Sequence, residues 1–250
     1  MNDKEIFAEL LKKPIDEIYK PEGIGTLGEK YLHALLKNFC EPNTLCHEVK
    51  VGKYTADVCI GTQIFEVQTR SMTPLKPKLE YYLEEGYKVT VVHPIARQKH
   101  IVWCDPESGE LSKPKKSPKK GQFCHALTNL ASIKYFLDWE NLSVKLLLLD
   151  VTEYRNQNGY GKSRKKRSTR LDTMPTELVD VVELNSPSDY LKILPSLPKV
   201  FSAKEFATAC KASEFQGRIA LGTLRYLEVV KEAGKEGKKI LYTLGDAYEN

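Results

Sequence analysis

Two carboxylates occupy positions where a buried strand would ordinarily carry apolar residues. Asp57 interrupts one apolar run, and Glu66 lies between Phe65 and Val67 in the next. Carboxylates that are crowded together repel one another unless a divalent cation lies between them, and hard oxygen ligands of this kind suit Mg²⁺ or Mn²⁺. If the two runs form neighbouring strands, Asp57 and Glu66 therefore predict a metal site.

A β-hairpin is the element that would position these acids. Its strands are expected over residues 47–60 and 63–70, on either side of a two-residue turn that contains glycine. Side chains two residues apart on a strand share a face, so Glu66 and Gln68 are expected on the same surface, with Arg70 farther along it. An ordinary solvent-facing hairpin with outward polar residues fits the same pattern. The elements on either side of the hairpin distinguish this alternative from a metal site.

The flanking elements follow a recognisable order. A helix that begins near Glu29 precedes the hairpin, and a helix over residues 75–86 and a buried strand over residues 88–96 follow it. Together with the acids, this order resembles the PD-(D/E)XK nuclease superfamily, which contains restriction endonucleases and archaeal Holliday-junction resolvases. The resemblance covers about residues 20–96. The positions that match the superfamily's motif are Glu29, Asp57, Glu66 and Gln68.

This resemblance implies a restriction-endonuclease-like core, an α/β fold with a mixed central sheet flanked by helices. It implies that Asp57, Glu66 and the Val67 carbonyl hold Mg²⁺ or Mn²⁺, with Glu29 as a further catalytic acid, and that Gln68 positions a water. The implied activity is metal-dependent hydrolysis of phosphodiester bonds in nucleic acid, with DNA the expected substrate. Superfamily nucleases that cut both strands often pair, which leaves a homodimer open.

Two positions depart from the superfamily's motif. Ala56 stands where the motif has proline, and Gln68 stands where it has lysine. Glutamine can orient a water but adds no positive charge for the transition state. Arg70 could replace that charge or contact a phosphate, and it fits a solvated strand end equally well. Glu29 also fits a helix capping box begun by Thr26. A catalytically inactive nuclease-fold protein that binds DNA is therefore an open alternative.

The composition fits a globular protein with a polyanionic partner. The chain has 250 residues, 41% of them hydrophobic and 28% charged, and a formal net charge of +5. No stretch approaches the roughly 18 apolar residues of a membrane helix, and the charged N-terminus lacks an export signal's apolar core, so we expect a cytoplasmic protein without membrane contact. The six cysteines include no CxxC pair and match no common zinc module, which favours reduced thiols.

Basic residues gather in two segments that are expected to be loops contacting nucleic-acid phosphates. Residues 112–122 are rich in lysine and proline, and six of the nine residues 162–170 are Lys or Arg. The second loop, residues 156–170, is expected at the tip of a hairpin whose return strand covers residues 178–184. A purely solubilising role is the alternative. The candidate phosphate contacts are Lys115, Lys116, Lys119, Lys120, Arg164, Lys165, Lys166, Arg167 and Arg170.

The C-terminal quarter of the chain follows a different pattern. A cluster of serine, proline and aspartate marks the expected boundary between a nuclease-like domain, residues 1–184, and a C-terminal domain, residues 185–250. Ser202 is expected to begin a helix, and Glu205 completes its capping box. A longer helix is expected from Ser213 to Gly234, ahead of a basic strand.

This pattern, over residues 186–245, resembles a winged helix-turn-helix domain. In such domains the second of the paired helices lies in the major groove of DNA, and a basic hairpin forms the wing. Binding to a partner subunit is the alternative role for the same fold. The nucleic-acid contacts that the resemblance implies are Gln216, Arg218, Arg225, Lys238 and Lys239.

Overall fold

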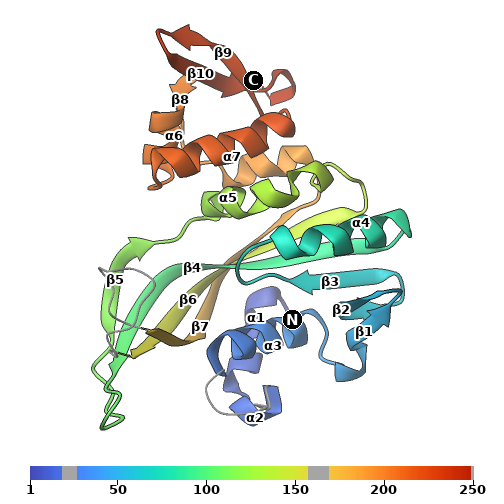
Figure 1. Cartoon of the computed structure of the whole chain (residues 1–250), viewed down its shortest axis with the longest axis vertical. Coiled ribbons are helices and arrows are strands. Elements are labelled where there is room, and N and C mark those ends of the chain that lie inside the picture. The colour runs from blue at the N-terminus through green and yellow to red at the C-terminus, as the bar shows by residue number, and fades with distance from the viewer. Residues whose placement is uncertain (19–26, 157–168, 249–250) are drawn as a thin grey trace. The chain divides into compact units, whose positions relative to one another are not determined.

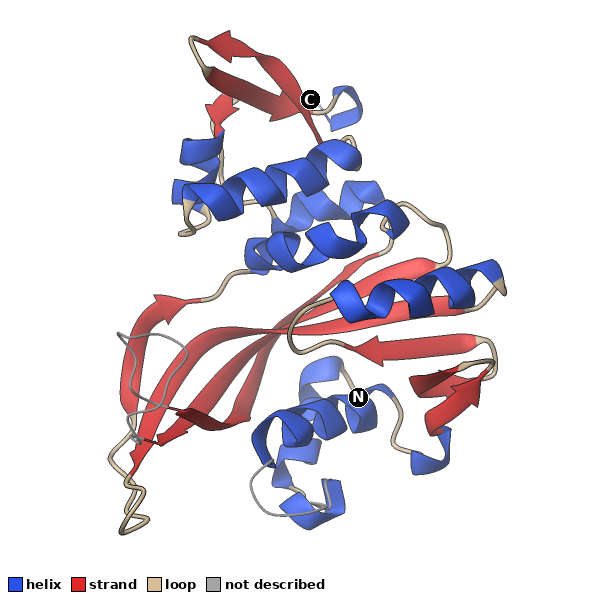
Figure 2. Ribbon diagram, in the orientation of Figure 1, coloured by secondary structure: helices blue, strands red, loops and turns tan. Residues whose placement is uncertain are grey.

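The structure, a computed structural model, describes residues 1–18, 27–156 and 169–248. Within these ranges the protein is a mixed α/β structure in which helices flank a mixed central sheet (Figures 1 and 2). The fold class expected from the sequence is therefore confirmed at this level. None of the helices in the described ranges has the length and apolar content needed to traverse a bilayer.

Seven strands of the described chain form the central sheet, in the order β1-β2-β3-β4-β6-β7 with β5 paired to β4. These strands are β1 (His47–Val51), β2 (Tyr54–Ile60), β3 (Gln63–Val67), β4 (Lys88–Cys104), β5 (Lys115–Lys120), β6 (Leu142–Asn156) and β7 (Thr169–Leu184). The helices that precede or connect them are α1 (Asp3–Lys12), α2 (Ile15–Ile18), α3 (Leu27–Cys40), α4 (Lys76–Glu84) and α5 (Ala126–Leu130), with a 3-10 segment, η4 (Ala131–Phe136), after α5.

The sheet is mixed because it combines a hairpin with a helical crossover. β2 and β3 pair antiparallel, with Val58 opposite Phe65, as the tight turn between them requires. β3 and β4 pair in parallel, with Val67 opposite Val92, because α4 carries the chain back to the start of the next strand. In Figure 1, α4 lies along these two strands. The expected hairpin and crossover helix are both present.

The chain divides into two compact units, each assembled from separate segments. One unit comprises Met1–His47, Ala96–Gly121 and Leu147–Val181. The other comprises Glu48–Ile95, Gln122–Leu146 and Val182–Asn250, and it contains the acidic hairpin. In the first unit the buried rings of Phe7 and Phe39 pack edge to face, with centroids 5.6 Å apart. The domain boundary at residues 184/185 stays a sequence-based prediction.

The expected hairpin strands are shorter than the sequence indicated. The segment 47–60 is two strands, broken at Gly52, whose φ of +55° is a left-handed conformation that glycine adopts without strain. β3 ends at Val67, and the N–H of Gln68 donates to the carbonyl of Val92 at 2.9 Å where the chain leaves the sheet. The strand alternation that was expected to place Gln68 and Arg70 on the face of Glu66 therefore does not extend to them.

The lysine-rich segment 112–122 is not the open loop that was expected, because it contains β5. This strand pairs antiparallel with β4, with His100 opposite Lys116. Lysines and Pro118 fit a strand whose side chains are largely exposed, because hydrogen bonds between backbones hold it in place. β4 is itself longer than the strand expected over residues 88–96, since it continues to Cys104 and gives β5 its partner.

The second basic segment lies partly outside the described residues. β6 and β7 are neighbours in the sheet, as a hairpin requires, and β7 begins at Thr169 rather than near Leu178. Residues 157–168 between them, including Arg164, Lys165, Lys166 and Arg167, lie outside the described residues.

A second, smaller sheet accompanies two helices near the C-terminus. It has the order β8-β10-β9 among the described strands. Its elements are β8 (Phe201–Ser202), α6 (Ala203–Ala209), α7 (Glu214–Tyr226), β9 (Val230–Glu236) and β10 (Lys239–Leu244), preceded by the 3-10 segment η5 (Pro187–Ile193). The capping box at Ser202 is confirmed, because its Oγ accepts from the N–H of Glu205 at 3.3 Å and the Glu205 carboxylate accepts from the N–H of Ser202 at 2.7 Å.

The predicted end of the second long helix, at Gly234, is wrong. α7 stops at Tyr226, and Glu228 adopts a left-handed φ of +57° that turns the chain away from the helix. The valines that follow favour extended backbone, and Val230 begins β9 by pairing with Leu244 of β10. The hairpin is consequently longer than the sequence indicated.

Gly217 and Gly222 of α7 provide a matched pair of substitutions. A Cβ added to Gly217 would lie 2.8 Å from the Cβ of Ala207 on α6, whereas one added to Gly222 would meet nothing within 4 Å. We therefore expect Gly217→Ala to destabilise the protein by roughly 1–3 kcal/mol through overpacking, and Gly222→Ala to stabilise it by about 0.5–1 kcal/mol through helix propensity. Urea unfolding measures both, and equal responses would contradict this packing of α6 against α7.

Candidate functional site

The register of the hairpin places Asp57 and Glu66 on the same face of the sheet. Val58 pairs with Phe65, and one further step along the antiparallel strands brings Asp57 opposite Glu66. Residues directly opposite each other in such a pair point to the same side. The Asp57 carboxylate also accepts a hydrogen bond from the N–H of Val67, with 2.8 Å between Oδ2 and N. The structure thus brings together the two acids that the sequence singled out.

Glu66 is a fully buried carboxylate with Lys78 as a counterion. Its relative exposure is 0%, and the Lys78 ammonium lies 3.0 Å from Oε1 and 2.9 Å from Oε2. Lys78 also donates to the carbonyl of Thr55 at 2.7 Å. Burial, followed by the charge of Asp57, raises the pKa of Glu66 from its usual 4.5 to about 7, while Lys78 opposes the rise. The charge of this carboxyl group therefore changes near neutral pH.

Lys78 is a residue of the candidate site whose position the sequence does not reveal directly. By sequence it is only a lysine near the start of a helix, where it could face a phosphate. The signal for its role is topological, because the crossover helix α4 directly follows β3 and must cross the sheet to reach β4. Lys78 stands in the first turn of that helix, so it reaches back to Glu66. It brings the positive charge that Gln68 cannot provide.

Gln68 is held by its backbone just beyond the end of β3. Its N–H donates to Val92, and its carbonyl accepts from Nδ1 of His93 at 2.5 Å. The Nε2 atom of the same imidazole lies 3.0 Å from the amide nitrogen of Asn129. Because a carbonyl only accepts, Nδ1 carries the proton and Nε2 accepts from Asn129. Burial lowers the pKa of His93, which keeps the ring neutral and suits both bonds.

The remaining predicted residues of this site are Glu29 and Arg70. Glu29 lies on α3, but its side chain is outside the described residues. Arg70 is exposed beyond the end of β3. Among the described side chains, no group of three or more His, Cys, Asp or Glu residues could share an ion. Asp57 and Glu66 nevertheless fit Mg²⁺, which proteins commonly bind through one or two carboxylates while it keeps several waters.

The described lysines of the first basic segment are fixed on a strand and exposed. These residues, on β5, are Lys115, Lys116, Lys119 and Lys120. Arg170, in β7, is also exposed. Because backbone pairing with β4 holds β5 in place, its lysines lose less conformational freedom on binding a polyanion than lysines of a loop would. This property favours contacts with phosphates.

The candidate DNA contacts of α7 are exposed but engaged in local bonds. The Gln216 side chain accepts from the N–H of Ser213 at 3.1 Å and completes a second capping box. Arg218 pairs with Glu214 on the same helix at 2.6 Å, and Arg225 pairs with Glu232 of β9 at 2.9 Å. Lys238 and Lys239 are exposed at the tip of the β9–β10 hairpin. Exposed ion pairs contribute only about 0–1 kcal/mol, so phosphates could displace them.

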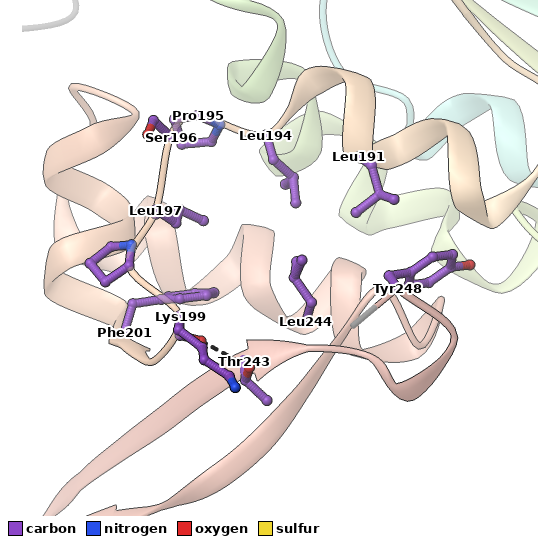
Figure 3. A pocket seen from close by; sticks show the side chains of 11 residues that line it. Leu191, Leu194, Pro195, Ser196, Leu197, Lys199, Phe201, Thr243, Leu244 and Tyr248 are labelled. Atoms are coloured by element: carbon purple, nitrogen blue, oxygen red, sulfur yellow. Dashed lines mark hydrogen bonds between the residues drawn. The ribbon is translucent and has the colours of Figure 1, made fainter. Parts of the chain in front are cut away.

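A cavity of about 800 Å³ lies beside the small C-terminal sheet and is largely apolar. Figure 3 shows Leu191, Leu194 and Leu244 directed into it, with Tyr248 at one side. The residues that line it include no carboxylate, histidine or cysteine. This cavity therefore offers mainly apolar contacts, and Lys199 and Tyr248 are the titratable side chains in its lining.

Residues 30–185 match the family described as a domain of unknown function (DUF8091). The chain belongs to this DUF8091 family. An uncharacterized protein from Treponema pallidum (strain Nichols) is 28% identical over 222 residues, which cover 88% of this chain and 86% of that protein. No solved structure matches the chain. The part matched to the DUF8091 family contains Asp57, Glu66 and Lys78, so the candidate site lies within the family's own domain.

The raised pKa of Glu66 predicts a pH-dependent stability. Between about pH 4.5 and 7 the unfolded chain releases this proton while the folded protein keeps it, so stability falls as pH rises through that window. The full shift corresponds to roughly 3 kcal/mol. Glu66→Gln cannot titrate, so we expect its stability to fall less between these pH values than that of the wild type.

Urea unfolding at several pH values between 4.5 and 7.5 measures this difference. Glu84→Gln, an exposed change of the same kind on α4, controls for the loss of one charge. Identical pH profiles for Glu66→Gln and the wild type would contradict the burial of an ionisable group at this position.

Proposed function

We propose that this protein is a metal-dependent nuclease that hydrolyses phosphodiester bonds in DNA and has a restriction-endonuclease-like core. The observation that carries the proposal is the meeting of Asp57 and Glu66 on one sheet face, with Lys78 in contact with both oxygens of Glu66. Two carboxylates and an ammonium group from adjoining elements suit a divalent cation and a phosphate. The order of hairpin, crossover helix and parallel strand supports the same fold.

Each residue of this set has a distinct role in the proposal. Asp57 and Glu66 would hold one Mg²⁺ or Mn²⁺, with the Val67 carbonyl as a further candidate ligand. Such a cation, when bound, lowers the pKa of a coordinated water and stabilises charge on the scissile phosphate. Without the cation, Lys78 pairs the buried Glu66 carboxylate. Once a cation takes its place on Glu66, the ammonium would supply the positive charge that the superfamily's motif places on the strand.

Gln68 orients the attacking water in this proposal. Its side chain is half-buried and adds no charge, so its contribution is limited to hydrogen bonding. The bonds of its backbone to Val92 and His93 restrict the chain at this position. A restricted backbone reduces the freedom that the amide must lose before it acts on a water.

The exposed cations would supply affinity for DNA without regard to sequence. The lysines of β5 and Arg170 are suited to phosphate contacts, which position a nucleic acid but do not read its bases. The C-terminal segment resembles a winged helix-turn-helix domain, in which α7 would approach the major groove and the β9–β10 hairpin would form the wing.

A DNA-binding protein without catalytic activity is the second candidate. The observation that favours it is the ion pair between Lys78 and Glu66, because it satisfies the buried carboxylate without a cation. In this case the fold and the basic surfaces serve recognition alone. The two candidates differ in whether a divalent cation can displace Lys78 from Glu66.

Cleavage of DNA separates these candidates. Purified protein incubated with supercoiled plasmid and with branched DNA is expected to cut in the presence of Mg²⁺ or Mn²⁺ and to be inactive with EDTA. We expect Asp57→Asn and Lys78→Met each to reduce the rate by roughly 10²–10³-fold, as removal of a group that stabilises transition-state charge does. Lys76→Met changes an exposed lysine in the same helical turn and should leave the rate within about threefold of the wild type.

Full activity of Asp57→Asn would exclude this site as the centre of hydrolysis. Binding of DNA without cutting under every metal condition would favour the second candidate. Absence of DNA binding at low salt would instead favour a role in protein assembly.

The salt dependence of binding tests the role of β5. Replacement of Lys115, Lys116, Lys119 and Lys120 by glutamine is expected to weaken DNA binding and to reduce the slope of log K against log salt by about 0.9 for each phosphate that the variant no longer neutralises. Fluorescence anisotropy at several salt concentrations measures both quantities. A control with Lys4, Lys12, Lys13 and Lys50 changed to glutamine alters net charge equally, and an identical slope for the two variants would show that β5 makes no specific contribution.

A further inference from the structure

Tyr82 of α4 carries a buried hydroxyl group without a hydrogen-bond partner among the described residues. The residue has a relative exposure of 0%, and its hydroxyl oxygen is fully enclosed. An unsatisfied buried hydroxyl destabilises the folded protein, so such groups usually have a bound water or ligand as a partner. The position of Tyr82 indicates what that partner would be.

The helix and the hairpin both place Tyr82 beside the acidic site. Lys78 and Tyr82 are four residues apart on α4 and therefore lie on the same helical face, and Lys78 contacts Glu66. The ring of Tyr82 also packs edge to face against Tyr54 of β2, with 6.1 Å between centroids, so this side of α4 lies against the hairpin. The charges of Glu66 and Asp57 both contribute to the raised pKa of the Tyr82 phenol, which therefore lies near the two acids.

The hydroxyl is held in its neutral, donating form. Burial, followed by the charges of Glu66 and Asp57, raises the pKa of Tyr82 well above its usual value. Both carboxylate oxygens of Glu66 accept from Lys78, and Oδ2 of Asp57 accepts from the Val67 N–H. A donor thus faces an acidic site in which these neighbours are already paired.

We propose that the Tyr82 hydroxyl donates a hydrogen bond to an oxygen ligand of the cation held by Asp57 and Glu66. That ligand is a bound water or a phosphate oxygen, both of which accept from a neutral phenol. The inference rests on the cation site of the proposed function and adds to it a donor that fixes the direction of the ligand. α4 would then provide two groups, the Lys78 ammonium for charge and the Tyr82 hydroxyl for orientation.

Binding of Mn²⁺ to the whole protein, measured by titration calorimetry, tests the inference independently of cleavage. Tyr82→Phe keeps the ring and removes only the hydroxyl, and we expect it to weaken Mn²⁺ binding roughly 5- to 30-fold, as loss of one hydrogen bond does. A loss seen with Mn²⁺ alone identifies a water as the acceptor. A loss seen only when inorganic phosphate is added identifies a phosphate oxygen. Without metal, the melting temperature of the variant should equal or exceed that of the wild type.

Tyr87→Phe is the matched control, because it removes the same hydroxyl group from a neighbouring tyrosine. The Tyr87 ring packs against the Tyr82 ring with 6.2 Å between centroids. Unchanged Mn²⁺ affinity of Tyr82→Phe, with and without phosphate, would overturn the inference while leaving the cation site intact, provided that Asp57→Asn abolishes binding. A lower melting temperature of Tyr82→Phe without metal would also overturn it, since the hydroxyl would then have a partner in the protein alone. Absence of Asp57-dependent Mn²⁺ binding to the wild type would overturn both the inference and the cation site.

Discussion

The ion pair between Glu66 and Lys78 is the interaction on which the candidate site depends. A carboxylate removed from water loses its hydration, which costs several kcal/mol unless a nearby opposite charge and hydrogen bonds replace it. Glu66 is fully buried, and Lys78 provides that replacement through contacts with both carboxylate oxygens. Asp57 works against it, because a second negative charge on the same face raises the pKa of Glu66. The site is therefore balanced between a charged and a neutral carboxyl group near pH 7.

The crossover from β3 to β4 makes this balance possible. Parallel neighbours need a connection that returns over the sheet, and here that connection is α4. Because the helix repeats about every 3.6 residues, Lys78 and Tyr82 fall on one side of it. That side faces the hairpin, as the bond from Lys78 to Glu66 and the contact of Tyr82 with Tyr54 both show. One helix thus places the Lys78 ammonium against Glu66 and the ring of Tyr82 against Tyr54.

The exposed lysines of β5 have two compatible explanations. Lysine side chains on an exposed strand discourage unwanted pairing with strands of other molecules, which accounts for their presence in structural terms. The same row of exposed charges would attract a polyanion, and its fixed spacing would lower the entropy lost on binding. The second explanation is the one that bears on the proposed function.

The sequence by itself determined the features that depend on local interactions. Alternating apolar residues around a glycine turn specified the hairpin that became β2 and β3, and Ser202 with Glu205 specified a capping box, because both signals involve residues close together in the chain. The mixed α/β class followed from the order of such elements. The acids Asp57 and Glu66 could be paired in advance because a hairpin fixes its own register.

Only the tertiary structure decided the features that depend on distant partners. The lysines of residues 115–120 form a strand because β4 offers a backbone ladder, and Val230 begins a strand because β10 lies beside it. The position of Lys78 over Glu66 depends on the path of a whole helix across the sheet. These outcomes arise from hydrogen bonds and burial between segments far apart in the chain, which local composition and periodicity do not encode.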